Sequence, residues 1–303
     1  MLLTWFDLFK GEIAALSGAI LWAGAAVVYT RFGQLLSPLV LNAVKGTIAI
    51  ALLLLTLALR GTGAGALDPS ATGLLLLSGL VGIGIGDTAY FTSLNLLGAR
   101  RTLLLETLAP LIAAFIALIW LGEQLNPLAW CGIALALAGV AWAIAERAPI
   151  EAAQNPTVPW LGIGVGVFSA LAQASGAVLA RAALVNSDIS PLWSALLRLS
   201  AGTLVLFPPI AIRRQLPQLL KPFQSRRLLL GLSLTAFIST YLGVWLQQTA
   251  FKFTAAGIAQ TLLATSPIFV LPIALWQGEK VSLRAGLGAA IALAGIALLF
   301  SGR

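Results

Sequence analysis

Ten apolar segments, each close to the length that crosses a membrane, follow one another along the 303-residue chain. A membrane-spanning helix needs about 20 mostly apolar residues. Strands of a membrane barrel would alternate apolar and polar residues, whereas these segments are apolar on all sides. We therefore predict an all-α integral membrane protein. The expected spans are 13–30, 38–58, 73–97, 102–121, 127–145, 160–180, 191–212, 228–250, 257–277 and 283–300.

Charge is too scarce for a soluble protein. Only 9% of the residues are charged and 59% are hydrophobic, whereas a soluble domain carries about 25% charged residues. Of the 18 Lys and Arg and 10 Asp and Glu residues, only four fall inside the expected spans, apart from Arg284 at the edge of the last one. Disorder is excluded because it requires low hydrophobicity and high charge. Most of the surface is therefore expected to contact membrane lipids.

The composition also removes several classes of chemistry. The sequence has no His and a single Cys, Cys131, which excludes disulfide frameworks, Cys/His zinc sites and Ser-His-Asp or Cys-His triads. No nucleotide-binding loop of the Walker type is present. We therefore expect neither a metal nor another cofactor, and a protein that is not an enzyme.

Basic residues outnumber acidic ones, with a formal net charge of +8. They gather only between Arg213 and Arg227, and basic residues beside membrane spans contact lipid headgroups and set topology. We therefore expect no nucleic-acid partner. With ten spans, five basic residues lie in connections on the side of the termini and eleven on the other side. This count places the termini outside the cytoplasm.

The sequence contains an internal repeat. Four pairs of matching segments occur in the same order and at nearly the same spacing in both halves, and the matches include charged residues and prolines. Chance similarity between apolar segments does not explain this agreement. The pairs are SPLVLNAVK (37–45) with SPLWSALLR (190–198), WLGE (120–123) with WQGE (276–279), ALAGVA (136–141) with ALAGIA (292–297), and Pro110 with Pro267.

The repeat predicts both the domain organisation and a mechanism. We expect one repeat over residues 1–148, a linker over 149–159 and a second repeat over 160–303. Five spans in each repeat is an odd number, so the second repeat enters the membrane from the opposite side. Such inverted repeats place a site at their interface near the bilayer midplane. Rocking of the repeats then opens this site to one side of the membrane and to the other in turn, which is alternating access.

Two segments resemble a known family. Residues 107–123 (TLAPLIAAFIALIWLGE) and 265–279 (TSPIFVLPIALWQGE) each end in Gly-Glu and are each followed by a Gly- and Ala-rich helix. This pattern is similar to EamA-type carriers of the drug/metabolite transporter superfamily. The resemblance implies ten helices, a central cavity, cytoplasmic termini and export of small metabolites. It also suggests that Glu123 and Glu279 have loop or capping roles. The charge count and the resemblance disagree on orientation, which stays open.

Function follows from the repeat and the resemblance together. We expect a secondary transporter of a bacterial cell membrane that exports small organic metabolites, amino acids or related compounds. A proton or substrate gradient would supply the energy, so that the partners are a small-molecule substrate and protons. Two alternatives stay open, namely an integral-membrane enzyme acting on a lipid and a channel.

The two intramembrane cations are candidate substrate ligands. A charge at the bilayer centre costs about 2.5–3.5 kcal/mol on insertion scales, and such residues are functional candidates by default. Lys45 and Arg198 are repeat counterparts, and together they could hold a carboxylate or phosphate. The alternative is a structural salt bridge to Asp87 or Glu106, or a side chain that extends to the membrane interface.

The two intramembrane acids are candidates for proton coupling. Asp87 and Glu106 break the repeat, because Val244 and Leu263 stand at the equivalent positions. A buried carboxyl could carry a proton. The alternatives are structural, with Asp87 as the partner of Lys45 on the neighbouring helix and Glu106 as the partner of an Arg at positions 100–101.

Neutral residues complete the candidate site. Pro110 and Pro267 lie within expected helices and predict kinks, which membrane proteins accept beside cavities. Aromatic rings could stack on a substrate and amides could hydrogen-bond it. Tyr29 lies near a helix end, where an interfacial anchor is the usual role. The further candidate ligands are Trp22, Tyr90, Gln173, Gln247 and Gln260.

Overall fold

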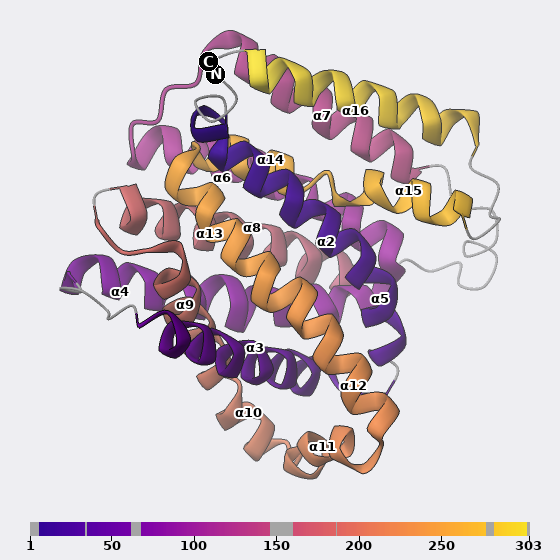
Figure 1. The fold of residues 1–303 in the computed structure, drawn as a ribbon. Helices are drawn as coiled ribbons and strands as arrows, with labels where there is room; N and C mark the ends of the chain where they lie inside the picture. Colours follow the sequence, from indigo (N-terminus) through magenta and orange to yellow (C-terminus); the bar gives the residue numbers. More distant parts are fainter. Residues whose placement is uncertain are drawn as a thin grey trace.

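A computed structural model of the chain describes residues 6–33, 35–61, 68–145, 160–185, 187–276 and 282–301. These residues form helices and connections without any strand, which confirms the all-α fold class (Figure 1). The expected linker at 149–159 lies outside the described residues, as does Glu279.

In the described part of the first half, α-helices are joined by a π-helical stretch. The elements are α2 (Lys10–Phe32), α3 (Pro38–Arg60), α4 (Pro69–Ser78), η1 (Gly79–Gly86), α5 (Asp87–Glu106), α6 (Leu108–Trp120) and α7 (Pro127–Ala145), and α5 is kinked at Gly98 (φ 77°). The second half follows the same plan with an additional surface segment. Its elements are α8 (Trp160–Val185), α9 (Pro191–Leu204), α10 (Phe207–Ile212), α11 (Leu216–Leu220), η2 (Lys221–Gln224), α12 (Arg226–Thr235), η3 (Ala236–Leu242), α13 (Gly243–Phe253), α14 (Ala256–Leu263), α15 (Ser266–Trp276) and α16 (Leu283–Ser301).

Eight of the ten expected spans are single helices or helix runs long and apolar enough to cross a membrane, counted within the described residues. The segment expected at 257–277 is different, because it is divided between α14 and α15 and only a shorter apolar stretch, Ala256–Pro272, qualifies. The segment expected at 13–30 corresponds to α2, which has 23 residues but is not among the eight. A count of ten membrane spans is therefore not established.

The Ser-Pro pair that begins each copy of the repeated SPL motif has a local structural role. The Ser37 hydroxyl caps α3 by accepting the Val40 N–H at 3.4 Å, and the Ser190 hydroxyl caps α9 by accepting the Trp193 N–H at 3.3 Å. The proline that follows each serine occupies the first helical position, where its missing N–H is not needed. The repeat thus sets the start of the helix that carries each intramembrane cation.

A π-helical stretch interrupts the third helix of each repeat at the same place. η1 joins α4 to α5, and η3 joins α12 to α13. Backbone carbonyls in both stretches accept side-chain hydrogen bonds from other helices. Asn42 Nδ2 donates to the carbonyl of Ile83 at 2.9 Å, and Trp22 Nε1 donates to the carbonyl of Ser239 at 2.8 Å. π-helical turns occur often at functional sites, and both of these stretches border the cavity described below.

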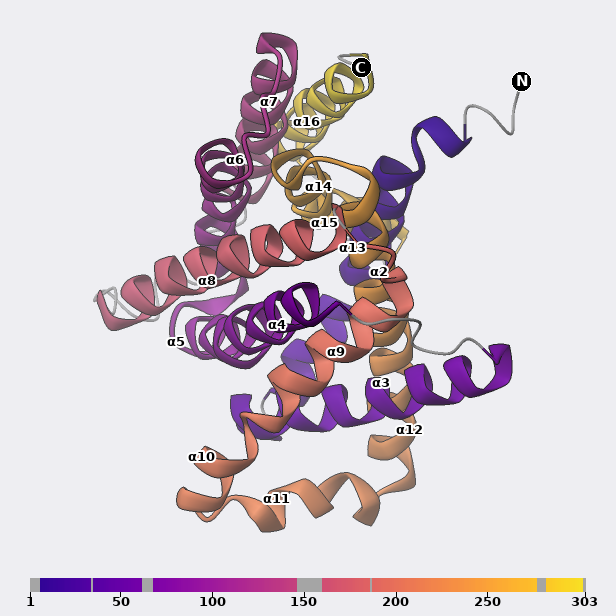
Figure 2. The same cartoon turned by 90° about the vertical axis from the view of Figure 1, so that its left-hand side faces the viewer.

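The two halves are interleaved rather than side by side. The helix run α4–η1–α5 of the first half packs against α8 and α9 of the second, as Figure 2 shows. The corresponding run η3–α13 of the second half packs against α2 and α3 of the first. Each repeat therefore completes the other, and a cavity between them has walls from both.

The last helices of the two repeats, α7 and α16, pack antiparallel at close range. A Cβ atom built on Gly139 would lie 2.4 Å from the backbone N of Ala292, and one built on Gly295 would lie 2.3 Å from that of Ala136. Only glycine permits this approach, which follows the small-residue packing of membrane helices. Because Gly139 and Gly295 are repeat counterparts, this contact is nearly symmetric.

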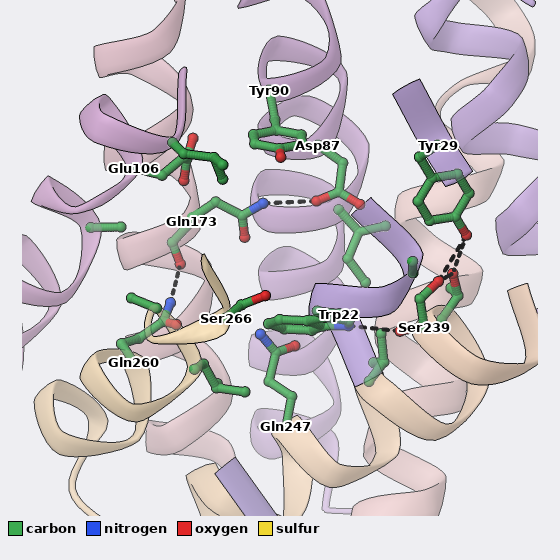
Figure 3. Close-up of a pocket in the computed structure, with 18 of the residues that line it drawn as sticks. Trp22, Tyr29, Asp87, Tyr90, Glu106, Gln173, Ser239, Gln247, Gln260 and Ser266 are labelled. Carbon is green, nitrogen blue, oxygen red and sulfur yellow. Dashed lines mark hydrogen bonds between the residues drawn. The ribbon is translucent and has the colours of Figure 1, made fainter. Parts of the chain in front are cut away.

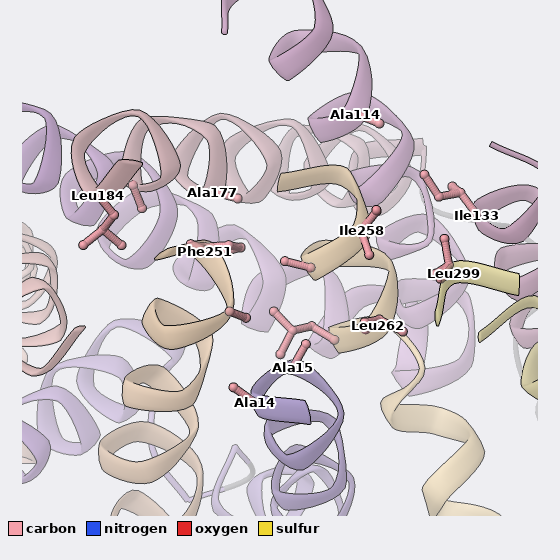
Figure 4. Close-up of a cluster of buried hydrophobic side chains, with 14 of the residues drawn as sticks. Ala14, Ala15, Ala114, Ile133, Ala177, Leu184, Phe251, Ile258, Leu262 and Leu299 are labelled. Carbon is pink, nitrogen blue, oxygen red and sulfur yellow. The ribbon is translucent and has the colours of Figure 1, made fainter. Parts of the chain in front are cut away.

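Small and branched apolar side chains form a core where the halves meet (Figure 4). Ala14 of α2, Ile133 of α7, Leu184 of α8, Phe251 of α13 and Leu299 of α16 all belong to one buried cluster. The core therefore holds helices of both repeats together.

Candidate functional site

A cavity of about 480 Å³ lies between the two repeats. Residues of α2, α3, α5 and α6 border it from the first half, and residues of α8, α9, α13, α14 and α15 border it from the second. Figure 3 shows side chains that line this space and labels those of both repeats, among them Asp87, Glu106 and Gln247. All eleven residues singled out from the sequence border it. They are Trp22, Lys45, Asp87, Tyr90, Glu106, Pro110, Gln173, Arg198, Gln247, Gln260 and Pro267.

Lys45 of α3 forms an ion pair with Asp87, the first residue of α5. The Lys45 Nζ atom lies 2.6 Å from Asp87 Oδ2. The other carboxylate oxygen, Oδ1, accepts a hydrogen bond of 2.7 Å from Gln173 Nε2. Both oxygens of Asp87 are therefore occupied, and the charge of Lys45 is balanced. Of the two roles the sequence left open for Asp87, the structure contains the pairing with Lys45.

Arg198 of α9 has no such counter-ion. Among the described residues, no carboxylate oxygen lies within 4.0 Å of its guanidinium. Nη1 donates to Gln247 Oε1 at 3.2 Å, and the guanidinium carbon lies 5.8 Å from the centre of the Phe251 ring. The salt bridge to Asp87 or Glu106 that the sequence allowed is not present. The side chain is only 2% exposed, so its charge is buried beside the cavity.

Glu106, the last residue of α5, has a neutral partner. Ser169 of α8 donates its hydroxyl to Glu106 Oε1 at 2.6 Å. The ion pair with Arg101 that the sequence allowed does not form within the described residues, and the side chain of Arg100 lies outside them. Glu106 therefore faces the cavity as a carboxyl that forms no ion pair with a basic side chain among the described residues.

Aromatic side chains form a wall near Lys45. Its Nζ atom lies 5.0 Å from the centre of the Phe91 ring and 6.0 Å from that of Tyr29. Tyr90 packs edge-on against Phe91 with ring centres 5.4 Å apart. Trp22 is anchored from the opposite half through the Ser239 carbonyl (Figure 3). Rings held in this way offer apolar faces to a ligand body.

Each proline lies just after a short irregularity in a helix. α5 ends at Glu106 and α6 begins at Leu108, so that Pro110 is in the first turn of α6. Likewise α14 ends at Leu263 and α15 begins at Ser266, immediately before Pro267. In a first turn the missing N–H of proline costs no hydrogen bond. The helix irregularities therefore lie just before each proline, where Thr107 and Ala264 keep right-handed helical backbone angles and both border the cavity.

Several lining residues were not identified from the sequence. Tyr29, which a helix-end position suggested as an interfacial anchor, is instead buried beside the cavity with its hydroxyl 2.8 Å from Ser239 Oγ. Thr240 and Ser266 also border the space. Hydroxyl residues are common in apolar helices, where they bond to the preceding turn. Composition and spacing therefore carried no signal for them.

Glu123 lies outside the cavity and has the capping role expected for it. Its Oε1 atom is 2.5 Å from Arg181 Nε, and its Oε2 atom accepts the Ala256 N–H at the start of α14. Arg181 also donates to the carbonyls of Phe251 and Lys252. The preceding Gly122 has a φ of 64°, which favours glycine. This loop ties the first repeat to the second.

The apolar helix runs, the interleaved repeats and the internal cavity define a multi-pass integral membrane protein. The family model described as "EamA-like transporter family" matches residues 9–145 and again residues 160–301. The chain belongs to this family, which confirms the resemblance seen in the sequence. It is therefore a membrane transporter of small molecules rather than a member of an enzyme family.

No curated protein matches the chain. A solved structure described only as "Crystal structure of protein" has the same fold. Its TM-score is 0.76 and its sequence identity is 18%, over 98% of this chain and 99% of that chain. At this identity the likeness concerns the fold alone.

Proposed function

We propose that the protein is a secondary transporter that exports small organic metabolites, amino acids or related compounds, by alternating access. The observation that carries this proposal is the cavity of about 480 Å³ with walls from both repeats. A volume in this range suits a small organic molecule. Rocking of two interleaved repeats about such a site would expose it to either side in turn.

Energy would come from an ion or substrate gradient in a bacterial cell membrane. The sequence has no Walker loop that could bind ATP. For proton coupling, Glu106 is the better of the two candidate acids, because Asp87 is held by Lys45 and Gln173 whereas Glu106 has a hydroxyl partner. A carboxyl that faces a cavity and pairs with no cation can exchange a proton between the two states.

Counterflow in proteoliposomes tests the proposal. Purified protein is reconstituted, the vesicles are loaded with one unlabelled metabolite of a panel, and uptake of the same labelled compound is followed. We expect saturable uptake that overshoots equilibrium for at least one compound, with empty liposomes as the control. Linear uptake without overshoot would indicate a channel, and product formation by the protein in detergent would indicate an enzyme. Either result would contradict the proposal.

A further inference from the structure

The two repeat-related cations differ in their partners, because among the described residues Lys45 forms an ion pair and Arg198 does not. This difference points to a ligand. Lys45 is neutralised by Asp87 at 2.6 Å. Arg198 lies at the equivalent position of the second repeat, and no described carboxylate oxygen lies within 4.0 Å of its guanidinium. We propose that Arg198 is the anion-binding group of the cavity and that its natural partner is the single carboxylate of the transported substrate. This inference rests on the proposed function.

Burial makes a missing partner significant. Arg198 is 2% exposed, and its Nε–H has no hydrogen-bond partner although the atom is inaccessible to water. The contacts that it makes, one amide oxygen and one aromatic ring, are neutral. A buried charge without a counter-ion is costly, and intramembrane charges usually pair with one another or serve a substrate pathway. A substrate carboxylate in the adjoining cavity would supply the missing charge.

The repeat shows why the partner is missing. In the first repeat the acid that balances the cation is Asp87 on the third helix. The equivalent residue on the third helix of the second repeat is Val244, which borders the same cavity. Gln247 bonds Arg198 and follows Val244 by three residues, so both lie on one face of α13. The position from which a protein carboxylate could reach Arg198 therefore holds an apolar side chain.

The remaining charges favour a ligand group with a single negative charge. A dianionic phosphate is usually bound by two or more cations, but the ammonium of Lys45 is already engaged by Asp87. The Glu106 carboxyl on the same cavity disfavours a second negative charge. The planar guanidinium fork matches a carboxylate. The aromatic wall of Trp22, Tyr90 and Phe91 would then contact an apolar substrate body.

A pair of substitutions at one position tests the proposal without removing Arg198. Val244→Asp places a carboxylate where the first repeat has Asp87, whereas Val244→Asn adds a polar side chain of the same size without charge. Ligand binding is measured as the thermal stabilisation of purified protein in detergent. The probes are phenylacetate, L-phenylalanine and L-leucine, each with its primary amide, and phenyl phosphate as the dianion.

We expect at least one acid to bind the natural sequence about 30-fold or more tightly than its amide, the ratio expected when a buried charge pair loses a partner. The Val244→Asp variant should bind that acid more weakly than the Val244→Asn variant, by a similar factor. Three results would overturn the proposal: equal binding of acid and amide, equal affinity in the two variants, or no acid-specific stabilisation up to the solubility of the probes. Tighter binding of phenyl phosphate would reassign the site to phosphate and would also overturn it.

A second pair of variants covers the case in which Val244→Asp does not fold as a monodisperse protein. Arg198→Lys keeps the charge and Arg198→Gln removes it, and only the former should retain a preference for acid over amide. Flux in proteoliposomes separates the two hypotheses. Acid-specific binding without counterflow contradicts the transport function alone, whereas counterflow that does not distinguish acid from amide contradicts the role of Arg198 alone.

Discussion

The first and second repeats share a backbone plan but differ in the charges that they bring to the cavity. Among the described residues, the first contributes Lys45, Asp87 and Glu106, and the second contributes Arg198 alone. At the two positions where the first repeat has an acid, the second has Val244 and Leu263. Duplication thus explains the scaffold, and divergence at two positions explains why one cation is neutralised and the other is not. The contact of α7 with α16 has not diverged in this way, because glycines in both repeats allow the same close approach.

The largest expected effect comes from making the first repeat resemble the second. Asp87→Val removes the partner of Lys45, whose side chain is only 10% exposed. Breaking a buried pair in this way costs about 3 kcal/mol of stability. Thermal and denaturant unfolding in detergent measure the loss, and adding Lys45→Met should recover most of it. A single variant as stable as the natural protein would show that the pair contributes little.

Removing the cation that has no ion-pair partner among the described residues should lower substrate affinity and leave stability largely unchanged. Arg198→Gln takes away a buried charge without stranding a protein carboxylate, so the stability of the unliganded protein should be nearly unchanged or higher. Affinity for carboxylate substrates should fall about 30-fold or more. Binding titrations and unfolding on the same preparation check both parts. Strong destabilisation with unchanged affinity would indicate a structural role for Arg198.

The symmetric contact provides a comparison outside the cavity. Gly295→Ala forces a methyl group against the backbone of Ala136 and should cost on the order of 1–2 kcal/mol by overpacking. Gly286→Ala on the same helix is the matched control, because a Cβ atom there meets nothing within 4 Å. Unfolding midpoints of the two variants give the comparison. Equal midpoints would mean that α7 and α16 can separate at little cost.

The smallest difference is expected at the helix caps. Ser190→Ala removes the cap of α9 and should cost about 1 kcal/mol. Ser37→Ala should cost somewhat more, because the Ser37 hydroxyl also donates to Gln215 Oε1 at 2.8 Å. Unfolding measurements on the two single variants rank them. The reverse order would show that the contact with Gln215 adds nothing to the cap.

Much of the fold could be predicted from the sequence, and the eleven residues that the sequence proposed as candidates all border the cavity. A polar residue or proline is conspicuous in an apolar span, because burying it in lipid is costly. The pairing of Asp87 with Lys45 was one of two roles that the sequence left open for this acid, and the sequence could not decide between them. Whether Lys45 or Arg198 would meet Asp87 depends on the rotation of α3, α5 and α9, which periodicity does not determine when a helix is apolar all round. Ser239 and Thr240 could not be recognised as cavity residues from the sequence, because hydroxyl residues are common in apolar helices.

The helix boundaries show a second limit. Segment 257–277 has the length and hydropathy of a single span, but the chain breaks between Leu263 and Ser266, before Pro267. Proline predicts a disturbance and does not distinguish a kink from a break. Gly79–Gly86 is rich in glycine, yet glycine alone does not predict a π-helical stretch.

The central claim is that the position of one acid decides which cation is free to bind the substrate. Exchanging the residues in the double variant Asp87→Val, Val244→Asp tests it most directly, with Val244→Asp alone as the reference. The measurement is the dissociation constant of the carboxylate probe that binds the natural protein. We predict that the single variant binds the probe more weakly than the natural protein. The double variant should bind it at least about tenfold more tightly than the single variant, because Lys45 is then free. Equal affinity in the single and double variants would contradict the account.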